Sequence, residues 1–231
     1  ASSCSIYGAS EGEAKKESNT LNPLTAYAKS KVAVEKVLQK CDMGDGTTAT
    51  SLRFATACGM SDRLRLDLVL NDFVASALIN NRIEILSDGT PWRPLIHVKD
   101  MSRAIEWAIH RNQKVAAPYL AVNIGSSLWN FQVSDLAKAV AEILPNCEVS
   151  INTKGQPDKR SYKVNFDLFK TLAPSYNPVY TLSDTISELV EGISEIRHLI
   201  SDNFRASDFM RLHILENHLK NKRLSPDLYW I

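Results

Sequence analysis

A chain of 231 residues with 44% apolar and 23% charged side chains has the length and composition of an ordinary globular protein with one large or two small domains. Its 27 basic and 26 acidic residues nearly cancel, which argues against a nucleic-acid partner, and no apolar run approaches the roughly 20 residues of a membrane span. The cysteines lie far apart, without zinc-site or disulfide spacing, so we expect no metal, reduced thiols and a cytoplasmic location.

Helical and strand patterns alternate along the chain, which favours the α/β fold class. Residues 1–6 look like the end of a strand, and helical periodicity predicts a helix over 25–40 with Thr25 as its N-cap. Residues 47–57 are β-branched and alternating, as in a central strand. The further elements that the pattern predicts are, in chain order, a helix over 66–77, strands over 83–86 and 95–98, a helix capped by Asp100, a strand over 119–124, a helix over 136–144, a strand over 148–152, a helix that a Thr181–Asp184 capping box opens, and an amphipathic helix after Ser201 that packs on the body or on a partner chain.

The sharpest chemical signal is the pair Tyr27 and Lys31, which stand four residues apart and so share one face of the predicted helix. An ammonium beside a phenol favours the phenolate and lowers a phenol pKa from about 10 toward neutrality. Such a phenol can exchange a proton with a sugar hydroxyl at physiological pH. Ser3, at the end of the preceding strand, is placed to hydrogen-bond the reacting oxygen. The plain alternative is an exposed helical Tyr–Lys contact, because a chain with 7 tyrosines can hold one such pair by chance.

Five sequence blocks surround this pair in a fixed order. They are SSCSIYG at 2–8, NPLTAYAKSK at 22–31, LRF at 52–54, DGTPWRPLIHVKD at 88–100 and DKRSY at 158–162. Together they closely resemble the extended short-chain dehydrogenase/reductase family, and within it the NAD-dependent sugar-nucleotide epimerases and dehydratases. The resemblance covers roughly residues 2–167, and so many ordered blocks make coincidence an inadequate explanation.

The resemblance implies the C-terminal portion of a Rossmann-like doubly wound parallel sheet, joined to a smaller α/β substrate-binding domain. It places residues 1–58 in the C-terminal half of the NAD-binding domain. Residues 59–231 fall mainly in the nucleotide-sugar domain, with some segments returning to the first domain and helices at the C-terminus. A homodimer through the Tyr–Lys helix is implied by the resemblance alone.

By the same resemblance, Tyr27 is the catalytic acid/base, Lys31 tunes it and binds the nicotinamide ribose, and Ser3 is the hydroxyl partner. The cofactor-binding positions are Tyr27, Lys31, Phe54 and Thr56. Arg93 matches the arginine that binds the nucleotide diphosphate, a role for which its planar fork suits phosphate oxygens. The substrate set is completed by Asn71 and Arg160, and Arg65 lies near the family's sugar and base contacts. The plain alternatives are a surface salt bridge for Arg93 and a structural role for Arg160.

The chain also departs from the family pattern. None of its 9 glycines forms the glycine-rich turn that cradles a dinucleotide pyrophosphate, so the chain looks N-terminally truncated. Binding of NAD or NADP is therefore expected only with the missing N-terminal half. Cys4 and Ser5 stand where family dehydratases carry an Asp–Glu pair, which disfavours dehydration and makes Cys4 a small buried residue. Thr56 replaces an asparagine of many epimerases, and His97 is expected to be structural.

The resemblance, together with these departures, implies that the complete protein epimerises a nucleotide sugar at C4. Tyr27 would take a proton from the sugar hydroxyl while a hydride passes to NAD, and the 4-keto sugar would be reduced on its other face. Two alternatives remain open: a reductase of a preformed ketosugar, and a non-catalytic fragment or half of a split protein that needs an NAD-binding partner.

Overall fold

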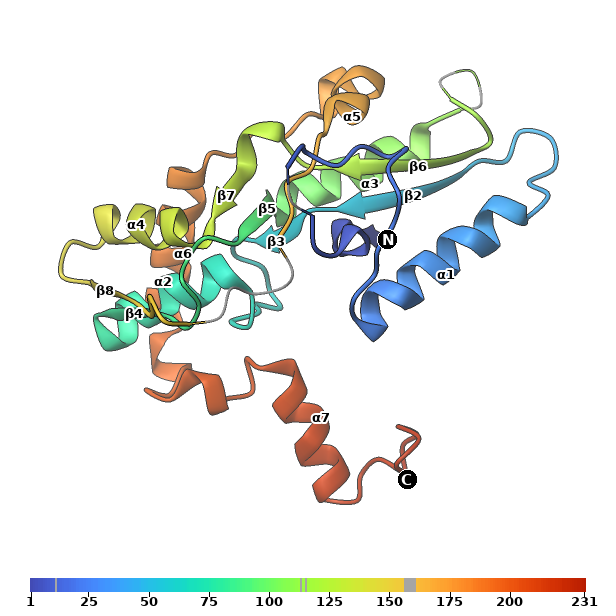
Figure 1. The fold of residues 1–231 in the computed structure, drawn as a ribbon. Coiled ribbons are helices and arrows are strands. Elements are labelled where there is room, and N and C mark those ends of the chain that lie inside the picture. Colours follow the sequence, from blue (N-terminus) through green and yellow to red (C-terminus); the bar gives the residue numbers. More distant parts are fainter. Residues whose placement is uncertain (11, 113, 115, 156–160) are drawn as a thin grey trace.

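The computed structural model describes residues 1–10, 12–112, 114, 116–155 and 161–231. Helices and strands alternate along most of the chain (Figure 1). The helices are α1 Ala26–Lys40, α2 Val69–Asn80, α3 Val98–His110, α4 Val133–Ile143, α5 Asp167–Leu172, α6 Leu182–Glu195 and α7 Arg211–Lys220. The strands are β1 Ser2–Ser3, β2 Ala49–Phe54, β3 Thr56–Cys58, β4 Arg82–Ile85, β5 Trp92–His97, β6 Tyr119–Ile124, β7 Asn130–Gln132 and β8 Glu148–Ile151.

One parallel sheet has the strand order β1-β2-β6. The register aligns Ser3 with Phe54 and Phe54 with Ile124, so all three strands end at one level. The chain crosses from β1 to β2 through α1, as parallel strands require a long connection. The second half of β2 is buried on both faces, which is typical of a strand inside a parallel sheet.

The remaining strands form two smaller sheets. In one, β5 lies between β3, its parallel neighbour, and β7, its antiparallel neighbour. In the other, β4 and β8 pair in parallel. Helices α2, α4 and α6 pack against one another beside these strands (Figure 1). The α/β class and its parallel sheets are therefore confirmed.

Two hydrophobic clusters stabilise the molecule, and the chain passes repeatedly between them. The first cluster joins the parallel sheet to α3 and α5, through residues such as Ile6, Leu52, Phe54, Trp107, Val122, Ile124, Phe166 and Phe169. The second joins α2, α4 and α6, through residues such as Leu70, Val74, Leu136, Val140, Ile186, Leu189 and Phe204. They meet at β5, where Leu95 belongs to the second cluster and Ile96 to the first. A domain boundary at residue 58 stays a prediction.

Most of the expected elements form. The N-cap of α1 is confirmed, because Thr25 Oγ1 accepts the Ala28 N–H at 3.1 Å. The Thr181–Asp184 capping box of α6 is confirmed as well. The single strand expected over 47–57 is instead divided at Ala55, whose N–H donates to the Ile124 carbonyl at 3.0 Å. From there β2 and β3 belong to different sheets.

Two local expectations are wrong, and a third is met only in part. Residues Cys4–Tyr7 form a 3-10 helix, so the strand ends at Ser3. Asp100 does not cap α3, because His97 is the N-cap and its ring nitrogen accepts the Lys99 N–H. The tail after Ser201 packs on the body through Phe204, but none of the residues of α7 is buried and α7 stands away from the other helices (Figure 1), so its packing on a partner chain stays a prediction. No helix among the described residues is long and apolar enough to cross a membrane.

Candidate functional site

Ser3 is the last residue of β1 and the N-cap of the following 3-10 helix. Its Oγ accepts the Ser5 N–H at 3.2 Å and donates to Ser5 Oγ at 2.9 Å. Both hydroxyls are partly exposed at the carboxyl ends of the parallel strands. That edge is where ligands bind in open α/β sheets. Two neutral hydroxyls are therefore available at the end of β1.

Tyr27 and Lys31 lie together on α1, as their spacing predicts. The Tyr27 side chain is 55% exposed, and the Lys31 ammonium lies 5.5 Å from the centre of its ring. Lys31 Nζ also donates to the Ala1 carbonyl at 3.0 Å, two residues before Ser3. The ammonium thus joins the Tyr27 face of the helix to the strand that ends in Ser3.

A second cation lies close enough to interact with the Tyr27 phenol. Arg65 forms a bidentate ion pair with Asp67, with Nε–Oδ1 and Nη2–Oδ2 distances of 3.0 and 2.8 Å. The hydrogen bonds to Asp67 raise the pKa of Arg65, and the phenol of Tyr27 adds to the effect. The sequence places Arg65 near the substrate contacts, but only the fold brings it near Tyr27.

The Cys4 thiol has no access to a substrate. Cys4 is fully buried, and its Sγ donates to the Arg53 carbonyl at 3.0 Å. Burial raises the pKa of the Cys4 thiol well above its ordinary value. A buried neutral thiol cannot replace the carboxylate acid of a dehydratase, which agrees with the sequence-based interpretation of this position.

Phe54 and Thr56 flank the step from β2 to β3. Phe54 is buried and lines a groove of about 420 Å³ together with Leu52 and Ile109. Successive side chains of a strand point to opposite faces, and Arg53 contacts α1, so Phe54 faces away from α1. This groove therefore lies on the side of the sheet opposite Tyr27. Thr56 is partly exposed at the start of β3.

The expected substrate residues fall into three different settings. Arg93 lies in β5, partly buried, and its Nη1 donates to the Trp92 carbonyl at 2.9 Å. Asn71 is 1% exposed, its Oδ1 accepts the Gly59 N–H at 3.1 Å, and its Nδ2 donates to the Arg65 carbonyl at 3.0 Å. Asn71 therefore holds the loop that carries Arg65. Arg160 lies outside the described residues.

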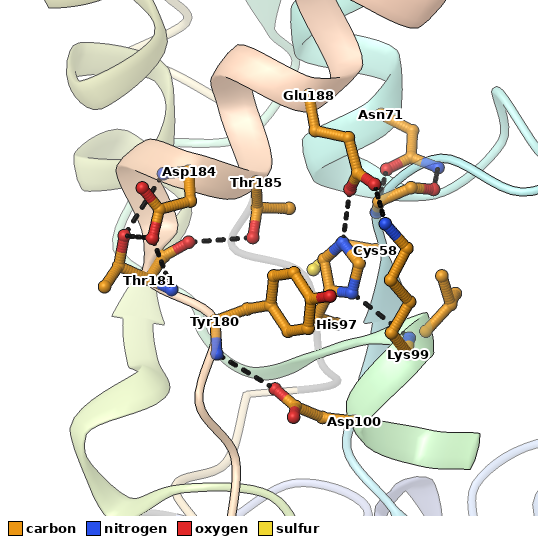
Figure 2. Close-up of polar contacts among 12 residues, drawn as sticks. Cys58, Asn71, His97, Lys99, Asp100, Tyr180, Thr181, Asp184, Thr185 and Glu188 are labelled. Carbon is orange, nitrogen blue, oxygen red and sulfur yellow. Dashed lines mark hydrogen bonds and ion pairs between the residues drawn. The ribbon is translucent and has the colours of Figure 1, made fainter. Parts of the chain in front are cut away.

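A second polar cluster joins β5, α3 and α6 (Figure 2). His97 is fully buried, and its Nδ1 accepts the Lys99 N–H at 3.1 Å, so Nε2 carries the proton that faces Glu188 Oε2 at 2.5 Å. Glu188 also pairs with the Lys99 ammonium. The Tyr180 ring stacks on the imidazole with a centroid distance of 4.0 Å.

Two further contacts complete this junction. Gly59 has a φ of +100° and lies against the imidazole, where a Cβ would come within 2.4 Å of His97 Nε2. Asp100, in the first turn of α3, is buried as well, and its carboxylate accepts the Val179 and Tyr180 N–H groups at distances of 3.1 to 3.3 Å. All these groups bond protein partners, so His97 is structural, in agreement with the sequence. Among the described residues, no group of three or more acidic, histidine or cysteine side chains is arranged to hold a metal ion.

The parallel sheet, with helix α1 crossing from β1 to β2, has the architecture of a Rossmann-like α/β fold. The sequence profile of the NAD-dependent epimerase/dehydratase family matches residues 1–125, more than half of the chain, and the chain belongs to that family. The family expected from the sequence is thereby confirmed.

Individual relatives agree with this assignment. The uncharacterized UDP-glucose epimerase YtcB of Bacillus subtilis (strain 168) is 27% identical over 127 residues, which are 55% of this chain and 38% of that protein. MoeE5 in complex with UDP-glucuronic acid and NAD superposes with a TM-score of 0.71 and 23% identity, over 84% of this chain and 63% of its own. A UDP-glucuronic acid 4-epimerase from Bacillus cereus, in complex with UDP-glucuronic acid and NAD, superposes with a TM-score of 0.68 and 22% identity, over 84% and 60% of the two chains. This chain spans less than two thirds of the length of each of them.

Proposed function

We propose that the protein containing this chain is an NAD-dependent epimerase that oxidises and re-reduces a nucleotide sugar at C4. The observation that carries the proposal is the Tyr27–Lys31 pair, which is held against β1 by the 3.0 Å bond from Lys31 to the Ala1 carbonyl. Ser3 lies on β1, which α1 contacts, and this proximity to the pair supports acid/base chemistry on one sugar hydroxyl.

The described residues fit the nicotinamide end of NAD. Tyr27 is exposed and Lys31 partly exposed on one helix face, beside the carboxyl ends of parallel strands, where ribose hydroxyls can be bound. When bound, NAD supplies the acceptor and donor of the C4 hydride. The chain has no glycine-rich cradle, so we assign the pyrophosphate to a part of the longer protein outside these residues.

Proton transfer is then the work of three side chains. Tyr27 takes the proton of the C4 hydroxyl and later returns it, while the Lys31 ammonium stabilises the phenolate. The Ser3 hydroxyl, which donates to Ser5 Oγ at 2.9 Å in the free site, turns to donate to the same sugar oxygen, while its Oγ still accepts the Ser5 N–H at 3.2 Å. The Arg93 guanidinium binds the diphosphate of the nucleotide.

The chemistry at Cys4 and Ser5 separates epimerisation from dehydration. Loss of water needs a carboxylic acid and a base near the leaving hydroxyl, and these positions carry a buried thiol and a neutral hydroxyl. Oxidation and reduction at C4 need only the phenol, the ammonium and the serine. Epimerisation therefore suits the residues present better than dehydration.

The test uses the natural full-length protein with NAD and UDP-hexoses that differ at C4. We expect the two C4 epimers to interconvert, and Tyr27→Phe to lower kcat by about 10²- to 10⁴-fold, the usual contribution of a general acid/base. Tyr229→Phe is the matched control, because Tyr229 is 75% exposed in the tail. Product analysis by NMR distinguishes the sugars.

Other outcomes would identify the alternatives. Reduction of a 4-keto sugar by NADH without epimerisation would point to a ketosugar reductase. Failure of the full-length protein both to bind NAD and to convert any sugar would favour the other alternative, a non-catalytic protein or one half of a split protein that needs an NAD-binding partner.

A further inference from the structure

A buried ion pair lies one helical turn beyond the proposed catalytic pair. Glu35 follows Lys31 by four residues and Tyr27 by eight, so the three side chains share one face of α1. Glu35 and its partner Arg53 are each only 5% exposed. Charged side chains are rarely buried to this extent unless they are paired.

The Glu35 carboxylate joins three elements. Its Oε2 accepts from Arg53 Nη2 at 2.7 Å, and Arg53 Nε lies 3.0 and 3.2 Å from the two carboxylate oxygens. Its Oε1 also accepts the Ser2 hydroxyl at 2.5 Å. Ser2 and Arg53 are register partners in neighbouring strands, so one carboxylate ties α1 to both β1 and β2.

The guanidinium of Arg53 is itself fixed by further contacts. Its Nη1 donates to the Tyr7 hydroxyl at 3.0 Å and to the Glu17 carbonyl at 3.2 Å. Tyr7 in turn donates to Asn123 Oδ1, on β6, at 2.7 Å. The network therefore reaches all three strands of the parallel sheet, and Arg53 cannot turn without breaking several hydrogen bonds.

We infer that Glu35 is a positioning residue for the reaction, because its ion pair fixes where α1 lies along the sheet and how the helix is rotated about its own axis. This inference rests on the proposed function. Apolar packing alone permits small sliding and rotation of a helix, whereas a bidentate ion pair has one good geometry. A rotation of α1 would move Tyr27 and Lys31 together, and so change their placement relative to Ser3.

The accessibility of the Lys31 ammonium can be used to measure the position of α1 relative to β1. Its ammonium reaches the Ala1 carbonyl at 3.0 Å only while α1 and β1 keep their present relation. Lys29 lies on the same helix, is exposed, and forms no side-chain bond to β1 among the described residues. The acetylation rates of Lys31 and Lys29 can therefore be compared within one molecule.

The first experiment measures lysine acetylation by mass spectrometry in the full-length protein. We expect Glu35→Gln to raise the rate at Lys31 at least threefold and to leave the rate at Lys29 unchanged. Ser2→Ala removes one hydroxyl that bonds Glu35 and keeps the ion pair with Arg53, and it should also raise the acetylation rate of Lys31. This variant provides the test if Glu35→Gln does not fold. An unchanged Lys31 rate in both variants would overturn the inference.

The second experiment measures kinetics on the same variants. Glu35→Gln should lower kcat by tenfold or more while KM for the nucleotide sugar changes less than twofold, and Glu35→Asp should recover part of kcat. Glu188→Gln is the matched control, because Glu188 is an ion-paired glutamate in the polar cluster around His97. This variant should lower stability without lowering kcat selectively over KM. An unchanged kcat in Glu35→Gln, despite faster acetylation of Lys31, would also overturn the inference.

The two proposals fail separately. An inactive full-length protein, in which Tyr27→Phe changes nothing, contradicts the proposed function. The acetylation rates then decide alone whether Glu35 positions the helix.

Discussion

Gly59 shows how one residue can decide the local geometry, here in the polar cluster around His97 that joins β5, α3 and α6. It adopts a φ of +100°, donates its N–H to Asn71 Oδ1 at 3.1 Å, and leaves no room for a Cβ against the His97 ring. Glycine is the residue that tolerates both a left-handed backbone and such close approach. The hydrogen bond from Gly59 to Asn71 also helps to hold the loop that carries Arg65, because Asn71 Nδ2 donates to the Arg65 carbonyl.

Replacement of Gly59 should therefore be costly. Gly59→Ala is expected to lower the free energy of unfolding by about 2–4 kcal/mol, since backbone strain and a forced displacement of the buried imidazole add together. Gly46→Ala is the matched control, with a φ of +78° and no atom within 4 Å of the place that a Cβ would occupy, and should cost about 1 kcal/mol. Urea unfolding measures both, and equal costs would mean that the His97 contact has no effect.

Single residues also show what the sequence can predict about the site. Tyr27, Lys31 and Ser3 follow from local spacing and ordered blocks. The roles of Glu35 and Asn71 do not, because their partners Arg53 and Gly59 become neighbours only when strands and loops assemble. A buried glutamate looks like any other charged helical position in a sequence.

Among the elements, α3 begins in an unusual way. Ser, Thr, Asp and Asn are the usual N-cap residues, so the pattern favours Asp100. The fold instead uses the His97 ring, because the Asp100 carboxylate is engaged with backbone N–H groups of Val179 and Tyr180, far along the chain. Helices such as α1 and α6 were predictable down to their caps, since their capping contacts are local.

The link from α3 to α6 should make stability depend on pH. Burial opposes ionisation of Glu188, but hydrogen bonds from Lys99 and His97 outweigh it and hold the pKa of that carboxyl below its ordinary value. A carboxyl with a depressed folded-state pKa stabilises the fold above its unfolded pKa of about 4.3, and this stabilisation is lost as pH falls through the folded value.

We therefore expect Glu188→Gln to destabilise the protein near pH 7 by about 1 kcal/mol, a modest figure because the side chain is partly exposed to solvent. The difference from the wild type should shrink as pH falls from about 5 to 3. Urea unfolding at several pH values measures it. A difference that stays constant over this range would show that the charge of Glu188 contributes nothing.

At the scale of the whole molecule, the C-terminal arm differs from the rest. Helix α7 has no buried residue, and Leu212, Leu215 and Leu219 are between 36% and 64% exposed. Phe204, just before it, is 1% exposed within the second cluster. The amphipathic pattern predicted the helix, but a pattern cannot tell which surface, if any, its apolar face meets.

Ending the chain after Met210 should therefore change the free energy of unfolding by less than about 1 kcal/mol, since surface segments add little. Phe204→Ala, by contrast, should cost about 3–5 kcal/mol through the cavity that it leaves. Thermal and urea unfolding of the two variants provide the comparison. A truncation as costly as Phe204→Ala would mean that α7 packs on the body in solution.

The pairing of β2 with β6 has a consequence for the order in which the molecule is built. Leu52 lies opposite Val122, so forming this ladder closes a loop on the order of 70 residues, and loops of that size slow folding. The second cluster depends on contacts of similar span, such as the pairing of Ile83 in β4 with Val149 in β8. During synthesis, β2 leaves the ribosome well before its partner. The strand beneath the Tyr27 helix must therefore stay unpaired on that edge until about 70 further residues have been made.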